Sequence, residues 1–332
     1  MAETKECFRI VFMGTPELAA TVLRAVAGWP AGRIVAVYTQ PDRPAGRGHK
    51  LTPSPVKVLA QSLGLPVEQP LNFKDEESCR KLAEYKPDFL LVAAYGLLLP
   101  VPVIETPRFP PLNVHTSLLP RYRGAAPIQR ALMENWEEGA QTGVSIMEIV
   151  QALDAGPVYA QEALPLAGHT GGTLHDALAE TGGRLLLSVL DQFAAGTAHA
   201  VPQDETQATY AAKLSKADGY VDWNAPAAAV DARIRAVTPW PGARSLFHFD
   251  GKEAQLLQLG PGKILRDMPL PRILPGSVFW DGSLLRVACT DAWYALGSVR
   301  PQGKKDMEAR AFVNGFVRPE SKGLCGRAER PA

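Results

Sequence analysis

Continuous apolar runs and helical patterns alternate along the first half of the chain. Apolar runs rich in β-branched residues occupy residues 8–14, 34–39 and 88–96, and amphipathic stretches occupy 16–28 and 53–64 between them. Apolar runs of this length are typical of strands that are buried on both faces, as in parallel sheets with helical crossovers. The pattern predicts a doubly wound, Rossmann-like α/β domain with a mostly parallel sheet.

The pattern changes in the second half. A helical stretch over 173–195 leads to a polar segment at 199–211, and one more helix is expected near 225–237. Beyond it, Gly, Pro and Asp separate short strand-like pieces such as SLFHFDG, EAQLLQLG, GSVFW and SLLRVAC. This spacing predicts a small, OB-like β-barrel. We therefore expect a first domain at 1–198, a linker at 199–211 and a C-terminal barrel domain at 212–332.

Composition is that of an ordinary globular protein. Of the 332 residues, 46% are hydrophobic and 21% are charged, which argues against a disordered, collagen-like or membrane protein. No apolar run reaches the roughly 20 residues of a membrane span and the first residues lack a signal-peptide layout. We expect a cytoplasmic protein and, by default, a monomer. The four cysteines are widely separated and offer no metal-binding spacing, so no metal is predicted.

Charge is distributed unevenly. Residues 209–332 hold 18 Lys and Arg against 12 Asp and Glu, a net charge of +6, whereas the preceding 208 residues carry −5. A basic segment favours a polyanionic partner, because neutralising phosphates releases counterions. A merely solvated basic face explains the same counts.

The end of the first expected strand has some features of a nucleotide-binding turn. In MGTPELAA, Thr15 can cap the following helix, Pro16 suits its first position and Glu17 favours its positive end. The glycines that let a pyrophosphate approach the backbone are missing. A dinucleotide site is therefore not expected.

The segment PLNVHTSLLPRYRGAAPIQRAL (111–132) carries an amide and an imidazole two residues apart. Side chains alternate along a strand, so Asn113 and His115 point to the same face if this segment is extended. An amide that donates to an oxygen becoming negative and a histidine that titrates near neutral pH suit acyl transfer to an amine. A structural histidine with satisfied hydrogen bonds is the alternative.

A carboxylate in a later loop can complete this pair. Asp154 is the only acid in the loop that follows the apolar strand GVSIMEI. A carboxylate beside a histidine fixes its tautomer and accepts the proton that an amine releases. Spacing alone does not show that Asp154 meets His115, and a solvated acid that caps a turn is the common alternative.

The NVH, SLLP and DAG motifs together resemble those of the formyltransferases that use 10-formyltetrahydrofolate. The resemblance implies that Asn113, His115 and Asp154 are catalytic, with 10-formyltetrahydrofolate as the donor and no metal. It also implies a folate pocket formed by Ser117, Leu118, Leu119 and Pro120, with Tyr95 of AAYGLLLP (93–100) as a wall.

Another resemblance concerns the acceptor. The loop YTQPDRPAGRGHKLTPSPVK (38–57) is similar to one that family members acting on methionyl-tRNA carry after their second strand, and PQGKKDM (301–307) is similar to part of their C-terminal barrel. The implied acceptor is the α-amino group of methionine on initiator tRNA. The implied tRNA contacts are Arg43, Arg47, Lys50, Lys304 and Lys305. A solvated loop and exposed lysines are the alternatives.

Three other functions would use similar residues. A formyltransferase for a small amine would share the site but lack the basic loop and the barrel. A hydrolase or dehydrogenase of formyl-folate would admit water in place of the amine. A non-catalytic RNA-binding protein would keep the fold and bind RNA without folate. Because the catalytic motifs, the basic loop and the barrel all occur in this chain, we expect a tRNA-directed formyltransferase.

Overall fold

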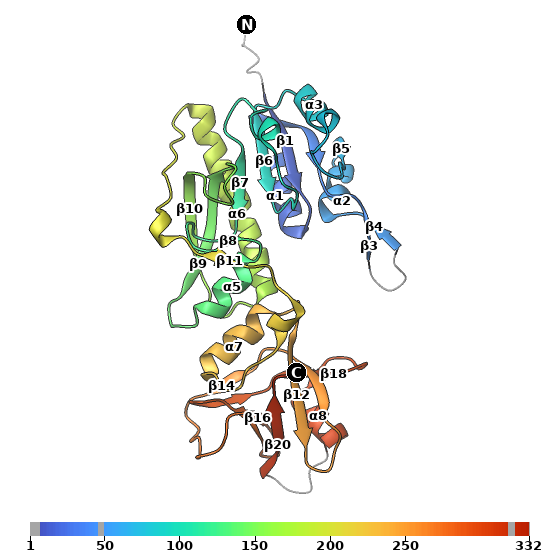
Figure 1. Ribbon diagram of the computed structural model, residues 1–332, viewed down its shortest axis with the longest axis vertical. Helices are drawn as coiled ribbons and strands as arrows, with labels where there is room; N and C mark the ends of the chain where they lie inside the picture. Colours follow the sequence, from blue (N-terminus) through green and yellow to red (C-terminus); the bar gives the residue numbers. More distant parts are fainter. Residues whose placement is uncertain (1–6, 46–49, 318–322, 332) are drawn as a thin grey trace. The chain divides into compact units, whose positions relative to one another are not determined.

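The computed structural model describes residues 7–45, 50–317 and 323–331 (Figure 1). The first sheet has seven strands in the order β10-β9-β7-β6-β1-β2-β5. These strands are β1 (Phe8–Gly14), β2 (Gly32–Tyr38), β5 (Val67–Glu68), β6 (Phe89–Ala93), β7 (Leu112–His115), β9 (Gln141–Glu148) and β10 (Val158–Pro165). The pairs β1/β2, β1/β6, β2/β5 and β6/β7 are parallel, and β7/β9 is antiparallel. The predicted α/β domain with a mostly parallel sheet is confirmed.

Helices cover both faces of this sheet. They are α1 (Glu17–Ala27), α2 (Pro55–Ser62), α3 (Glu76–Glu84), α4 (Val101–Ile104) and α6 (Gly171–Ala195). On one face, α6 packs so closely that a Cβ at Gly182 would lie 2.6 Å from the Val114 side chain of β7. On the other face, Leu82 of α3 and Val103 of α4 belong to one buried cluster with Val92 of β6. Among the described residues, no helix is both long and apolar enough to cross a membrane.

This layering determines where the chemistry can lie. Val114 points towards α6. Side chains alternate along a strand, so Asn113 and His115 point to the opposite face of the sheet. Asn113 and His115 therefore lie on the face of the sheet that α3 and α4 cover. On that face, the two helices lie over the part of the sheet formed by β1 and β6.

One local prediction is wrong. The helix α1 begins at Glu17 with Pro16 as its N-cap residue, and no side chain caps it. The Thr15 hydroxyl donates instead to the carbonyl oxygen of Tyr95 at 2.9 Å, and that oxygen also accepts from the Gln40 amide at 2.9 Å. Because β1 lies beside β6, the hydroxyl finds its acceptor on the neighbouring strand end rather than in its own helix.

The second sheet is antiparallel and has nine strands, in the order β14-β17-β16-β15-β20-β12-β13-β18-β19. Its strands are β12 (Ala243–Phe249), β13 (Gln255–Leu259), β14 (Lys263–Leu265), β15 (Ser277–Trp280), β16 (Leu285–Ala288), β17 (Trp293–Ala295), β18 (Ser298–Pro301), β19 (Met307–Glu308) and β20 (Gly323–Glu329). Alternate residues of β12, such as Phe247 and Phe249, are buried and face the core enclosed by this second sheet. The predicted C-terminal barrel is confirmed as an antiparallel half-barrel accompanied by α7 (Ala227–Ala236) and α8 (Ala309–Phe312).

The described chain forms two compact units that interleave in sequence. One unit holds the residues up to Pro127 together with Thr142–Leu164 and His175–Ala211. The other holds Ile128–Gln141, Pro165–Leu174 and the residues from Ala212 onward. Most of α5 (Pro127–Glu134) therefore belongs to the second unit.

Contacts inside each unit tie its separate segments together. In the second unit, Arg130 of α5 forms a 2.9 Å ion pair with Asp218, and Arg235 of α7 donates to the His169 carbonyl oxygen at 2.8 Å. In the first unit, the segment 199–211 contributes β11 (Tyr210–Ala211), which pairs with β8 (Arg123–Gly124). The residues that we assigned to a linker thus pack beside the loop that follows the SLLP motif.

Candidate active site

The structure brings His115 and Asp154 together. His115 ends β7, and Asp154 lies in the loop between β9 and β10. His115 Nδ1 and Asp154 Oδ2 are 3.7 Å apart, and the two side chains are 7% and 17% exposed. The other ring nitrogen, Nε2, lies 3.0 Å from the carbonyl oxygen of Tyr122. Since a carbonyl oxygen only accepts, Nε2 carries a hydrogen and Nδ1 is the nitrogen that faces Asp154.

The loop that carries Asp154 is fixed by its neighbours. Asp154 adopts φ +49°, a left-handed conformation that is uncommon for a residue other than glycine. Its Oδ2 atom accepts the backbone N–H of Gly124 at 2.8 Å. A Cβ at Gly156 would lie 1.9 Å from the Glu148 carbonyl oxygen, so the end of the loop passes that strand too closely for any side chain.

Asn113 lies on the same face of β7 as His115. It is half-buried, and Val114 between them is buried on the other face. Within the described residues, the Asn113 side chain has no hydrogen-bond partner. The carboxamide is therefore available to a bound molecule.

A buried serine holds the SLLP loop. The Ser145 hydroxyl on β9 accepts the Leu119 N–H at 3.0 Å and donates to the Ser117 carbonyl oxygen at 2.7 Å. Gln161 on β10 donates to the Leu119 carbonyl oxygen and to the Ser145 hydroxyl, at 2.8 Å each. Ser117 and Leu119 are buried by these contacts. The half-buried members of the loop are Leu118 and Pro120.

Tyr95 follows β6 directly and is buried. Its ring belongs to the cluster beneath α3 and α4, with the ring centroid 6.4 Å from that of Phe73. Burial raises the pKa of its hydroxyl, which has no hydrogen-bond partner among the described residues. An unpaired buried hydroxyl is unusual and is compatible with a ligand partner. The assignment of Tyr95 to the folate pocket stays a prediction.

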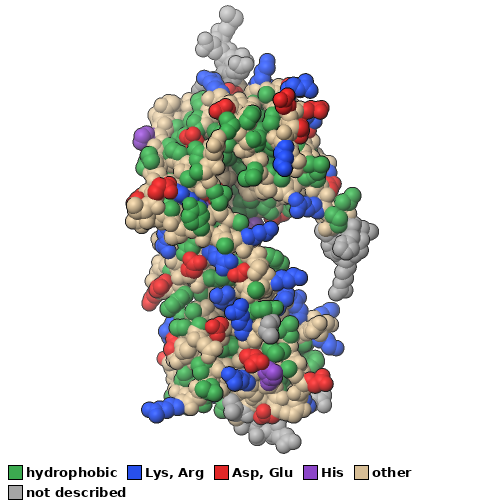
Figure 2. Space-filling view, in the orientation of Figure 1, with side chains coloured by type: hydrophobic (Ala, Val, Ile, Leu, Met, Phe, Trp, Pro, Cys, Tyr) green, Lys and Arg blue, Asp and Glu red, His purple; other side chains and the backbone are tan. Residues whose placement is uncertain are grey.

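The residues that were predicted to contact tRNA are exposed where the structure describes them. Arg43 begins β3 (Arg43–Ala45), and its guanidinium donates to the Gln40 side chain at 2.6 Å. Lys304 and Lys305 are exposed in the turn after β18. Arg47 and the side chain of Lys50 lie outside the described part of the chain. Lys and Arg side chains recur across the visible face of the second unit (Figure 2).

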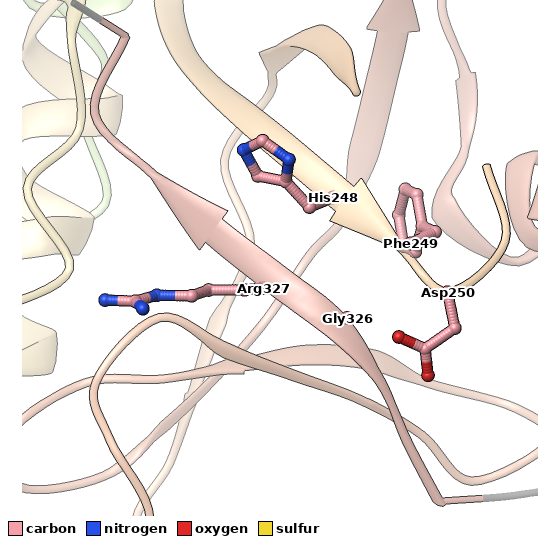
Figure 3. Close-up of a pocket in the computed structure, with 5 residues that line it drawn as sticks. All are labelled: His248, Phe249, Asp250, Gly326 and Arg327. Atoms are coloured by element: carbon pink, nitrogen blue, oxygen red, sulfur yellow. The ribbon is translucent and has the colours of Figure 1, made fainter. Parts of the chain in front are cut away.

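A hollow of about 290 Å³ in the second unit is lined by residues of the paired strands β12 and β20 and by Asp250 (Figure 3). His248 and Arg327 are opposite each other in the register of these strands, and His248 Nε2 lies 2.8 Å from Glu329 Oε1. None of the residues predicted from the sequence lines this hollow. The candidate chemistry is located at the loops after β7 and β9 instead.

Comparison with known proteins decides the family. The chain matches the formyl transferase family over residues 8–190 and the C-terminal domain of formyl transferases over residues 213–317. The chain belongs to the formyl transferase family. This formyl transferase is 54% identical over 336 residues to a methionyl-tRNA formyltransferase of Desulfovibrio desulfuricans, and the match covers 100% of this chain and 99% of that protein.

Two solved structures share the fold of this formyl transferase. An N-formyltransferase from Helicobacter canadensis, in complex with folinic acid and dTDP-3-aminofucose, gives a TM-score of 0.64 at 13% identity, covering 89% of this chain and 100% of that one. HypX from Aquifex aeolicus, in complex with tetrahydrofolic acid, gives 0.58 at 18% identity, covering 96% of this chain and 50% of that one.

Sequence reasoning missed the residues that hold the site in this formyl transferase. Ser145 and Gln161 fix the SLLP loop, and Gln203 donates to the backbone of the Asp154 loop. Each is a single polar residue far along the chain from its partners. The only sequence signal is that Ser145 interrupts an otherwise apolar strand.

Proposed function

We propose that this formyl transferase moves the formyl group of 10-formyltetrahydrofolate to the α-amino group of initiator methionyl-tRNA. The observation that carries the chemistry is the buried His115–Asp154 pair, whose nearest atoms are 3.7 Å apart, with Asn113 on the same face of β7. The choice of acceptor is supported by the 54% identity, over the full chain, to a methionyl-tRNA formyltransferase.

The three residues take different parts in the transfer. The bound donor supplies a formyl group that its folate nitrogen already activates. The Asn113 amide donates to the formyl oxygen, which becomes negative as the amine adds to the formyl carbon. His115 Nε2 is occupied by the Tyr122 carbonyl, so His115 Nδ1 is the nitrogen that donates to this oxygen when protonated. The Asp154 carboxylate stabilises the imidazolium and accepts the proton that the amine releases. The bond between the formyl carbon and the folate nitrogen then breaks, and tetrahydrofolate leaves with that proton on its nitrogen.

The residues around this set suit a folate. Ser145 and Gln161 keep the SLLP loop in one conformation, which leaves the half-buried Leu118 and Pro120 for an aromatic ring system to pack against. The unpaired hydroxyl of Tyr95 offers a hydrogen bond to a polar ring atom. A mostly apolar pocket with a few polar groups is the usual form of a cofactor site.

The second unit and the loop after β2 suit the tRNA. Arg43, Lys304 and Lys305 are exposed cations, and Arg47 and Lys50 belong to the same loop as Arg43. Cations on surfaces bind the phosphate backbone without reading its sequence. We propose that the protein acts as a monomer in the cytoplasm, where both substrates meet it.

The test is transfer of labelled formyl from 10-formyltetrahydrofolate to methionine-charged initiator tRNA, beside elongator methionyl-tRNA and a mixture of small amines. Labelling of the initiator tRNA in preference to the others is the expected result. If only a small amine is labelled, the proposed catalytic residues stand but the proposal that tRNA is the acceptor is wrong. Release of formate without any amine would identify a hydrolase.

A further inference from the structure

Two residues that flank Arg123 each contact one partner of the His115–Asp154 pair. The Tyr122 carbonyl oxygen lies 3.0 Å from His115 Nε2, and the Gly124 N–H donates to Asp154 Oδ2 at 2.8 Å. Arg123 stands between these two backbone contacts in the sequence and is 2% exposed, the largest of the fully buried side chains among the described residues. A buried guanidinium must be compensated by acceptors.

The acceptors come from the segment 203–205. The Arg123 guanidinium makes two bonds to the Glu205 carboxylate, at 2.9 and 2.7 Å, and the bond from Arg123 lowers the pKa of that carboxyl. It makes two more to the side-chain oxygen of Gln203, at 3.1 and 2.8 Å. Because a guanidinium only donates, Gln203 must turn its oxygen towards Arg123 and its NH2 group away.

The NH2 group of Gln203 then meets the loop that carries Asp154. Its nitrogen donates to the Asp154 carbonyl oxygen at 2.8 Å and to the Gly156 carbonyl oxygen at 2.7 Å. The first of these bonds is made to Asp154 itself, the residue with φ +49°, and the second is made two residues further along the loop. A non-glycine residue in this region persists only where its surroundings hold it.

We propose that Gln203 is a positioning residue for formyl transfer. Oriented by Arg123, its amide holds the backbone at Asp154 so that the carboxylate stays beside His115 Nδ1. Gln203 does not act on the substrates itself, and the inference rests on the proposed role of Asp154. The same arrangement explains why the segment after α6 belongs to the first unit.

The decisive variant is Gln203→Glu, which keeps the length of the side chain and an oxygen for Arg123. It replaces the two donated hydrogens with a charged oxygen that repels the Asp154 and Gly156 carbonyls. We expect a loss of about 10–100-fold in kcat, the range seen when the hydrogen-bonded partners that orient ligands of a metal site are removed. The KM values for both substrates should stay within about twofold, because neither substrate contacts Gln203. Gln207→Glu, an exposed change in the neighbouring turn, should behave as wild type.

A second measurement separates positioning from general structural support. In an Asp154→Asn background, Gln203→Glu should lower kcat by less than about twofold further, since the group that it positions is already disabled. An equal loss in both backgrounds, or a kcat for Gln203→Glu above half of the wild-type value, overturns the proposal. If Gln203→Glu does not fold, Gln203→Met takes its place under the same criteria. Failure of both to fold would make Gln203 a folding residue and overturn the proposal as well.

A crystal structure of the Gln203→Glu protein gives a readout that does not depend on activity. The Asp154 carboxylate is expected to have moved away from His115 Nδ1, and an unmoved carboxylate overturns the inference. Wild-type protein in the same formylation assay tests the proposed function separately. If the wild-type protein transfers formyl and the Gln203→Glu variant is as active, only the role of Gln203 is rejected. If the wild-type protein does not transfer formyl to methionyl-tRNA, the proposed function is rejected.

Discussion

His115 Nδ1 and Asp154 Oδ2 are 3.7 Å apart, beyond the range of a strong hydrogen bond, although both side chains are largely buried. The carboxylate oxygen is already engaged by the Gly124 N–H, and the other imidazole nitrogen by the Tyr122 carbonyl. The separation leaves His115 Nδ1 free to contact a reacting group while it stays close enough to the carboxylate for charge stabilisation.

Replacing His115 or Asp154 with Ala should lower kcat for formyl transfer at least a hundredfold, because each removes an acid–base or charge-stabilising group. The measurement is steady-state transfer of formyl to methionyl-tRNA. His175→Ala is the matched control, since His175 forms a comparable pair with Asp176 at 3.0 Å on α6. Near-normal turnover of either active-site variant would remove that residue from the mechanism.

Ser145→Ala should weaken the folate site more than the chemistry. The change leaves the buried Leu119 N–H without its acceptor, and we expect a loss of about 1–3 kcal/mol in the free energy of unfolding. Because the SLLP loop then loosens, the KM for 10-formyltetrahydrofolate should rise by a larger factor than kcat falls. Ser188→Ala, an exposed serine on α6, is the control. An unchanged KM would argue against a folate role for the loop.

Gly156→Ala should destabilise the protein and reduce turnover together. The added methyl group would lie 1.9 Å from the Glu148 carbonyl oxygen, so the Asp154 loop must shift. Overpacking of this kind costs about 1–3 kcal/mol. Thermal unfolding and kcat measure the two effects, with Gly315→Ala as the control because its added methyl group meets nothing within 4 Å. Wild-type stability and turnover would mean that the loop tolerates displacement.

Asp218 should make the stability of the protein depend on pH in the acid range. Burial alone would raise the pKa of its carboxyl, but hydrogen bonds from Ser215 and the charge of Arg130 outweigh burial and lower that pKa. The stabilisation is therefore complete above the unfolded-state pKa, near 4, and is lost as pH falls through the lower folded-state value.

The melting temperatures of wild type and Asp218→Asn, measured from pH 7 to pH 2, test this dependence. Wild type should melt higher at pH 7, and the difference should close below about pH 4. Asp250→Asn removes an exposed carboxylate that has no ion pair among the described residues, and it should show no comparable trend. A difference that is independent of pH would mean that the Asp218 charge does not stabilise the fold.

Replacing Lys304 and Lys305 with Ala should raise the KM for methionyl-tRNA and leave that for folate unchanged. If both lysines contact phosphates, a plot of the logarithm of tRNA affinity against that of salt concentration should become shallower by about one unit per lysine. The paired change of Lys252 and Lys263, two other exposed lysines of the second unit, controls for net charge. If the two paired changes have equal effects, Lys304 and Lys305 attract tRNA only through the net charge of the protein and make no contact of their own.

The sequence predicted those features that depend on local patterns. The apolar run at 8–14 became β1 without a change of bounds, because a buried parallel strand needs an uninterrupted apolar stretch. The alternation of Asn113 and His115 followed from their spacing in a strand. Both inferences use only neighbours in sequence.

The features that the sequence did not predict depend on partners far along the chain. The Thr15 hydroxyl bonds to Tyr95, 80 residues away, and Gln203 bonds to Asp154, 49 residues away. A polar residue in a sequence shows that it needs a partner but not which one. The helix cap expected of Thr15 failed for that reason, and Gln203 was indistinguishable from its polar neighbours.

The interleaving of the two units limits how the protein can be rebuilt by recombination. The chain passes between the units five times, so a single crossover after residue 211 would import a new half-barrel without its matching segments 128–141 and 165–174. Arg130 would lose Asp218 unless the incoming parent also has a carboxylate there, and the bond from Arg235 would depend on the place of the backbone carbonyl in the retained segment 165–174. A functional chimera that replaces the second unit therefore has to exchange its three stretches together.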